Sequence, residues 1–132
     1  RVQNYGTVIV TLADEDKEEA IPLIRRFYNM GFNIEATSLT AETLKKHGIR
    51  TKVLGKPSEG SREILDAICA GYVSYVINTR AILSGVHYED GVAIRSAATR
   101  NNITIFTSLD TVRVLLDVLE EITIGISAIT EE

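Results

Sequence analysis

The sequence predicts an α/β domain of three layers, in which helices cover both faces of a mainly parallel, five-stranded sheet. Short apolar runs rich in β-branched residues alternate along the chain with segments of helical character. The segments between the runs have the length that right-handed βαβ crossovers need. Runs such as Gly6–Leu12 are almost continuously apolar, which is typical of strands buried on both faces.

In the first half of the chain, the first strand is predicted at 6–12. A helix follows from Asp16 to about Met30, where Gly31 ends it, and Asp16 and Glu19 have the spacing of a capping box. Pro22 lies past the first turn, so a kink or a later helix start is expected. The next elements are a strand at 32–36, a helix at 40–47 closed by Gly48, and a strand at 49–54.

In the second half, Ser61 is expected to cap a helix that ends at Gly71, before a fourth strand at 73–77. The stretch 78–90 is predicted to be irregular, and it is long for a connection in a compact α/β unit. A helix at about 92–100, a strand at 103–106 and a helix from Ser108 to about Glu121 complete the core, which spans about 5–122. The tail that follows, to residue 132, is β-prone, and no element is predicted for it.

Length and composition indicate one globular domain. With 132 residues the chain can bury a sizeable core, and its net charge of −4 argues against partners such as nucleic acid or an anionic membrane surface. Cys69 is the single cysteine, so no internal disulfide can form and a cytoplasmic location is expected. No apolar run is long enough to predict a transmembrane helix. Because the chain begins at Arg1 rather than Met, we expect it to be a piece of a larger polypeptide.

Polar side chains follow each of the first four predicted strands. In a parallel sheet these positions share one edge, and ligands of open α/β sheets bind outside the carboxyl ends of the strands. The two lysines of the set suggest an anion, and a helix N-terminus such as the one after Thr37 can hold a phosphate. An asparagine offers a donor and an acceptor together, which suits a base or ribose edge. The candidate site residues are Lys17, Thr37, Thr40, Lys56, Asn78 and Thr79, and Ser38, Arg80 and Arg95 are further candidates.

Each of these residues also has a common structural role. Thr40 or Ser38 could cap a helix, and Lys17 could belong to a solvated cluster with the neighbouring acidic residues. Lys56 could be a surface lysine, and Asn78 could satisfy its own backbone in a turn. A joint site is favoured because all six principal residues fall on the same edge of the sheet.

The sequence lacks the residues that several other functional classes of α/β domain require. A phosphate-accepting receiver domain needs an aspartate after its third strand and a lysine after its fifth, where this chain has Leu54-Gly55-Lys56 and Phe106-Thr107-Ser108. There is no glycine-rich dinucleotide or Walker motif. His47 and His87 have no spaced partners for zinc, and no pair of nucleophile and base is visible, so neither a metal site nor a catalytic residue is predicted.

Several short motifs occur together along the chain: Asp16-Lys17-Glu18, Gly31 to Thr37, Thr40-Ala41, Lys56 with Glu59-Gly60, Val76 to Thr79, and Asp90-Gly91 with Ile94-Arg95. With them, the span from about Tyr5 to Glu121 resembles the methylglyoxal-synthase-like (MGS-like) domain family. The resemblance is strongest to the C-terminal allosteric domain of carbamoyl phosphate synthase large subunits. It implies a flavodoxin-like fold and a regulatory domain that binds nucleotide effectors.

The resemblance also implies partners and roles. Effector phosphate would be bound by Lys17, Thr37, Thr40 and Lys56, with base and ribose near Asn78 and Thr79. Effectors of such domains are UMP and either IMP or phosphoribosyl pyrophosphate. The parent ligase uses ATP with Mg or Mn in pyrimidine and arginine biosynthesis, and this domain itself would need no cofactor. Its protein partners would be the rest of the large subunit and the glutamine amidotransferase small subunit, and a homo-oligomer is left open.

The sequence departs from the family pattern at two positions, and two alternative functions stand beside the regulatory one. Leu39 stands where the family commonly has glycine, and Ser96 replaces a frequent second arginine, so effector binding could be weaker than usual. Methylglyoxal synthase is the enzyme alternative, but Ser61 and Thr79 occupy its catalytic aspartate positions, and neither side chain can act as a carboxylate base. A docking module without a ligand is the third possibility.

Overall fold

The computed structural model describes residues 6–79 and 86–131, with side chains for 6–79 and 90–125. One five-stranded sheet, in the order β3-β2-β1-β4-β5, forms the middle layer, and all of its pairings are parallel. The predicted fold class is therefore confirmed. The strands are β1 (Thr7–Thr11), β2 (Asn33–Thr37), β3 (Thr51–Leu54), β4 (Val73–Asn78) and β5 (Thr104–Phe106).

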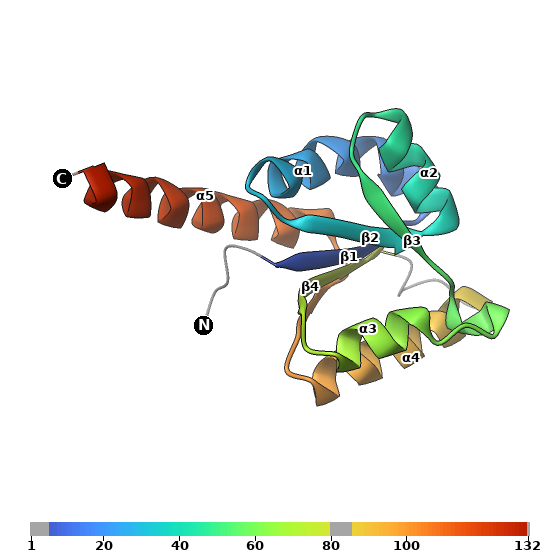
Figure 1. Cartoon of the computed structure of the whole chain (residues 1–132). Coiled ribbons are helices and arrows are strands. Elements are labelled where there is room, and N and C mark those ends of the chain that lie inside the picture. Colours follow the sequence, from blue (N-terminus) through green and yellow to red (C-terminus); the bar gives the residue numbers. More distant parts are fainter. Residues whose placement is uncertain (1–5, 80–85, 132) are drawn as a thin grey trace.

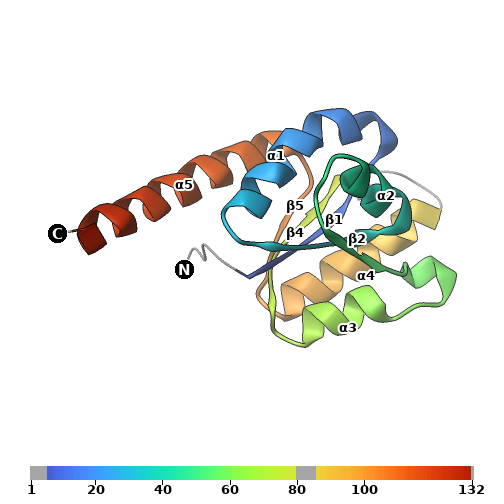
Figure 2. The same cartoon turned by 45° about the horizontal axis from the view of Figure 1, so that its top comes forward.

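Helices cover both faces of this sheet (Figure 1). Figures 1 and 2 place α1, α2 and α5 on one face and α3 and α4 on the other. Two short 3-10 helices, η1 and η2, follow β1 and β3. The bounds are η1 (Asp14–Asp16), α1 (Lys17–Asn29), α2 (Ser38–Lys46), η2 (Pro57–Glu59), α3 (Glu63–Cys69), α4 (Val86–Arg100) and α5 (Leu109–Glu131).

Two buried clusters hold the layers together. The larger lies under α1, α2 and α5 and is centred on Phe27, Phe32 and Tyr75, whose rings contact one another. The smaller lies under α3 and α4, where Ile9 and Val76 of the sheet meet Ile68 and Ile94. Successive residues in the middle of β1 and at 75–77 of β4 enter opposite clusters, which explains why these stretches are apolar on both faces.

The strand order creates a switch point beside β1. The chain moves from β1 outward to β2 and β3, and then returns to the other side of β1 for β4 and β5. Crevices at such switch points, outside the carboxyl ends of the strands, are the usual ligand sites of open α/β sheets. Thr11 pairs with Asn78 in the register of the sheet, and Thr37 ends β2 one position beyond the Val10–Ala36 pair. These three residues therefore form one row at the carboxyl edge.

Three expectations about helices are corrected. The stretch 78–90 is not wholly irregular, because α4 already begins at Val86; residues 80–85 lie outside the described part. The β-prone tail is helical, since α5 continues to Glu131. β-Branched residues disfavour a helix by only a few tenths of a kcal/mol each, roughly, and extending a formed helix needs no new nucleus. Figures 1 and 2 show the last turns of α5 extending beyond the sheet.

The start of α1 is the third correction. Neither Asp16 nor Glu19 forms a capping box: Asp16 makes no side-chain cap bond, and Glu19 pairs with Arg113 of α5. α1 nevertheless begins at Lys17 and includes Pro22 in one continuous element. The missing N–H of Pro22 removes only the bond to residue 18, close to the helix start, so packing of the buried face of α1 outweighs the loss.

Candidate ligand-binding site

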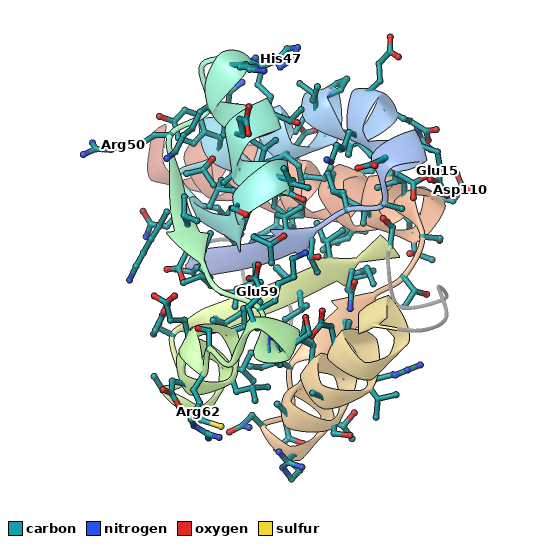
Figure 3. All side chains as sticks on the ribbon, turned by 90° about the vertical axis from the view of Figure 1, so that its right-hand side faces the viewer. Glu15, His47, Arg50, Glu59, Arg62 and Asp110 are labelled. Atoms are coloured by element: carbon teal, nitrogen blue, oxygen red, sulfur yellow. The ribbon has the colours of Figure 1, made fainter. Side chains whose placement is uncertain are left out.

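The six principal candidate residues all lie at the carboxyl edge of the sheet or in the turns that leave it. Figure 3 views the molecule from the side to which the strands point. Lys17 begins α1 after β1, and Thr37 and Thr40 flank the start of α2. Lys56 lies in the turn that follows β3, and Asn78 is the last residue of β4. The order of the strands therefore brings these residues to one edge, as expected.

Thr40 and Thr79 have structural roles that local sequence does not predict. The Thr40 hydroxyl accepts a hydrogen bond from the backbone N–H of Leu12 at 3.2 Å. The Thr79 hydroxyl accepts one from the N–H of Ala13 at 2.9 Å. Both side chains are buried, and Thr40 makes no capping bond in α2. Capping is therefore the wrong explanation for Thr40, and each hydroxyl keeps its proton to donate elsewhere.

Thr37 and Asn78 are the unusual pair at this edge. Both are almost fully buried, at 2% and 1% exposed. Within the described residues, Thr37 Oγ1 and Asn78 Oδ1 have no hydrogen-bond partner. An unpaired buried polar group is destabilising by roughly 1–3 kcal/mol, so such groups call for an explanation. A ligand that bonds to them is one explanation. Because side chains alternate along a strand, Thr37 and Asn78 lie on the α3/α4 side of the sheet, in the row that includes Thr11.

Lys17 is held at the start of α1 by an acidic neighbour. Its Nζ lies 2.8 Å from Asp14 Oδ1, and its side chain is 17% exposed whereas that of Asp14 is 85% exposed. The ion pair offsets the unfavourable position of a cation at a helix N-terminus. Since Asp14 is almost fully solvated, an anionic ligand could replace it as the partner of Lys17.

Lys56 lies in a turn of residues 55–61, which we call the Lys56 turn, and three of its N–H groups bind carboxylates. The N–H of Gly55 donates to Glu63 at 2.9 Å and that of Lys56 to Glu59 at 3.0 Å. The N–H of Ser58 donates to Asp90 at 2.8 Å. A phosphate would therefore meet the ammonium group of Lys56 rather than free amides of the turn. Nothing in the local sequence predicts the contact between Ser58 and Asp90.

The remaining candidates are exposed or lie outside the described residues. Ser38 and Leu39 are exposed in the first turn of α2, and Arg95 and Ser96 are exposed on α4. Arg95 lines an open depression with Val92, Ser96, Thr99 and Arg100 along the outer side of that helix. Arg80 lies outside the described residues. The structure thus places Arg95 and Ser38 on the surface, whereas Thr37 and Asn78 are buried.

A hollow of about 320 Å³ opens at the other corner of this edge, where α1 and α5 begin. Its walls carry the carboxylates of Asp16, Glu19 and Asp110 beside the hydroxyls of Thr79 and Ser108. Figure 3 shows Glu15 and Asp110 close together at this corner and Glu59 well apart from them. Glu19 and Asp110 both pair with Arg113, so the negative charge of this corner is partly compensated.

A second hollow, of about 310 Å³, lies at the amino ends of β2 and β3, beside Tyr28, Arg50 and Lys52. Glu35 borders it and is buried, and it accepts a hydrogen bond from Tyr72 Oη at 3.1 Å. Burial, with the nearby Glu35 carboxylate, raises the pKa of Tyr72 above its ordinary value. This hollow is at the edge opposite to the candidate residues, so it forms no part of their site.

Metal and membrane features are not found in the described part of the chain. Among residues with described side chains, no group of three or more histidine, cysteine, aspartate or glutamate residues is arranged to hold a metal ion. No described helix combines the length and apolar character that a membrane span needs.

Within the described residues, the chain is a three-layer α/β domain with two unpaired buried polar atoms beside the switch point of its sheet. A family model for the MGS-like domain matches residues 19–107. The chain therefore belongs to the MGS-like domain family. It is also similar to the crystal structure of methylglyoxal synthase from Elizabethkingia anophelis NUHP1, with 17% identity and a TM-score of 0.66 over 87% of this chain and 79% of that chain. At this identity the similarity shows the flavodoxin-like fold alone.

Proposed function

We propose that this domain is a regulatory module of a carbamoyl phosphate synthase large chain and binds a nucleotide effector through its phosphate. The observation that carries the proposal is the buried pair at the carboxyl edge. Thr37 Oγ1 and Asn78 Oδ1 lack partners in the described residues, and an effector would supply them. Lys17 and Lys56 would supply positive charge at the ends of the neighbouring strands.

An enzymatic role as a methylglyoxal synthase is less well supported. Proton abstraction beside a carbonyl needs a base, usually a carboxylate. Of the two positions assigned by resemblance to catalytic aspartates, Ser61 accepts a hydrogen bond from the N–H of Glu63 at 3.1 Å, and Thr79 accepts one from Ala13 at 2.9 Å. Both hydroxyls serve the backbone, and neither ionises near neutral pH.

Ligand binding can be tested directly on the 132-residue chain. Isothermal calorimetry and thermal melting with UMP, IMP and phosphoribosyl pyrophosphate should detect an effector, and uridine controls for the phosphate. A ligand present at 100 times its dissociation constant should raise the free energy of unfolding by about 2.7 kcal/mol. If none of the three phosphorylated compounds shifts the melting curve, a docking module without a ligand becomes the better interpretation.

A matched pair of variants locates the site. Thr37→Val removes the unpaired buried hydroxyl and should weaken effector binding, whereas Thr43→Val alters a half-buried threonine of α2 whose hydroxyl bonds within its own helix, and should leave binding unchanged. A separate assay for methylglyoxal from dihydroxyacetone phosphate addresses the enzyme alternative. Turnover by the wild-type chain would replace the regulatory proposal with the enzymatic one.

Regulation of the parent enzyme would then follow from linkage. An effector shifts an equilibrium only by the difference between its affinities for the two states, typically about 1–3 kcal/mol. Adding the effector that binds this domain to the complete synthetase, with ATP, bicarbonate and glutamine, should change its rate of carbamoyl phosphate formation. The Thr37→Val substitution should abolish that change.

A further inference from the structure

The Lys56 turn is joined to α4 by a single acidic residue. Asp90 Oδ1 accepts a hydrogen bond from the Ser58 N–H, and Asp90 Oδ2 accepts one from the Ser58 hydroxyl, both at 2.8 Å. η2, in the middle of the turn, packs beside the start of α4 in Figures 1 and 2. The two residues are 32 positions apart in the sequence, so the contact ties separate parts of the fold.

The other carboxylates that bond to the turn act only locally. Glu59 and Glu63 bond to backbone N–H groups three and eight residues away. Among the described residues, Asp90 is therefore the carboxylate that joins the turn to a distant part of the chain. Asp90 thus joins the turn to α4 through side-chain hydrogen bonds.

Asp90 makes this contact as a buried group. The residue is 8% exposed, and no lysine, arginine or histidine of the described part lies within 4.0 Å of its carboxylate. A buried carboxylate is unfavourable unless it is well hydrogen-bonded, and bonds to a charged acceptor are about twice as strong as neutral ones. Both oxygens of Asp90 are bonded to Ser58, which makes the attachment stiff.

We propose that Asp90 is a positioning residue, which holds the Lys56 turn where the Lys56 ammonium group can meet a phosphate at the carboxyl edge. The inference rests on the proposed function for the identity of the ligand. The attachment itself is a property of the fold. A competing explanation is that Asp90 occupies donors that a phosphate would otherwise use, and it predicts the opposite effect on binding.

Two substitutions at Asp90 separate these explanations. Asp90→Asn keeps both hydrogen bonds, because the amide oxygen accepts from the Ser58 N–H and the amide nitrogen donates to the Ser58 hydroxyl oxygen. It also removes a negative charge near the phosphate, so affinity for UMP and inorganic phosphate should be unchanged or higher. Asp90→Ala releases the turn, and affinity should fall on the order of tenfold. Ser58→Ala added to Asp90→Ala should cause little further loss.

Each contrary result has a definite meaning. Tighter phosphate binding by Asp90→Ala, or unchanged binding, would overturn the positioning role. Equal weakening by Asp90→Asn and Asp90→Ala would also overturn it, because it would indicate direct contact between the carboxylate and the ligand.

Hydrogen exchange at the Ser58 amide tests the attachment without a ligand. Protection should be kept in Asp90→Asn and lost in Asp90→Ala, and equal protection in both would overturn the inference. If the wild-type chain binds neither UMP nor phosphate, the proposed function fails, and this exchange result still decides whether Asp90 holds the turn. If Asp90→Ala does not fold, Ser58→Ala, which removes the hydroxyl bond and keeps the bond from the Ser58 N–H, should show partial loss of protection.

Discussion

Thr40 and Thr79 hold the same turn from opposite sides of β1. Their hydroxyl oxygens accept hydrogen bonds from the successive backbone N–H groups of Leu12 and Ala13. Thr40 belongs to α2, which follows β2, and Thr79 follows β4, so the two strands that flank β1 both secure its carboxyl end. The switch point of the sheet is thereby fixed by side chains that were candidates for ligand contact.

Replacing either threonine by valine should destabilise the fold. Thr40→Val and Thr79→Val keep the shape of the side chain but leave a buried N–H without an acceptor, and each should lower the free energy of unfolding by about 1–3 kcal/mol. Urea denaturation measures this. Thr43→Val, whose hydroxyl donates to its own helix on the surface, is the control and should change stability much less. A loss no larger than that of the control would contradict the structural role.

Thr37→Val should have the opposite effect on stability. The Thr37 hydroxyl is buried and unpartnered among the described residues, so replacing it by a methyl group removes an unsatisfied polar group. The free energy of unfolding should be unchanged or higher by up to about 1 kcal/mol in the absence of ligand. Chemical denaturation of Thr37→Val and Thr40→Val compares the same substitution at two positions three residues apart, for which changes of opposite sign are expected.

Gly55→Ala should disturb the Lys56 turn. A Cβ atom at Gly55 would lie 2.6 Å from both Cβ and Oγ of Ser61, so the turn must open to admit it. We expect a loss of stability of about 1–3 kcal/mol, with weaker binding of the proposed effector, measured by denaturation and calorimetry. Gly125→Ala is the control, because nothing lies within 4 Å of its added Cβ. In α5 that change should be neutral or stabilising by up to about 1 kcal/mol.

An ion pair between α1 and α5 should make stability depend on pH. Arg26 donates to Glu120 at 2.5 and 3.1 Å, and these hydrogen bonds lower the pKa of Glu120 below its ordinary value. The stabilisation is present above the unfolded pKa of a glutamate and is lost as the pH falls through the lower, folded pKa. Because the Glu120 side chain is 41% exposed, solvent screening keeps the contribution below about 1 kcal/mol.

Glu120→Gln measures that contribution. It should lower stability slightly at pH 7 and should make the acid side of the stability profile less steep. Glu42→Gln removes a looser pair with Lys46, at 3.5 Å on the surface of α2, and should have a smaller effect. Equal pH profiles for the wild type and Glu120→Gln would show that the pair adds nothing.

Local patterns predicted most of the elements because each depends on nearby residues. The alternation of apolar runs and helical segments was enough to define the layers, and Gly31 and Gly48 follow their helices with positive φ angles, as expected of helix-ending glycines. α5 was predicted too short because its β-branched end favours a strand locally, whereas the structure continues a helix already formed by packing of Val112 and Leu116.

By itself, the sequence determined the fold class and the edge of the sheet at which the polar residues gather. Both follow from apolar periodicity and from the fact that parallel strands end together. Only the tertiary structure decided what each polar residue does there. Thr37, Thr40, Asn78 and Thr79 carry polar groups at or just after strand ends, yet the hydroxyls of Thr40 and Thr79 satisfy the β1 turn, whereas Thr37 Oγ1 and Asn78 Oδ1 have no partner in the described chain. That difference depends on which backbone groups lie within about 3 Å, and distances between residues far apart in sequence exist only once the chain has folded.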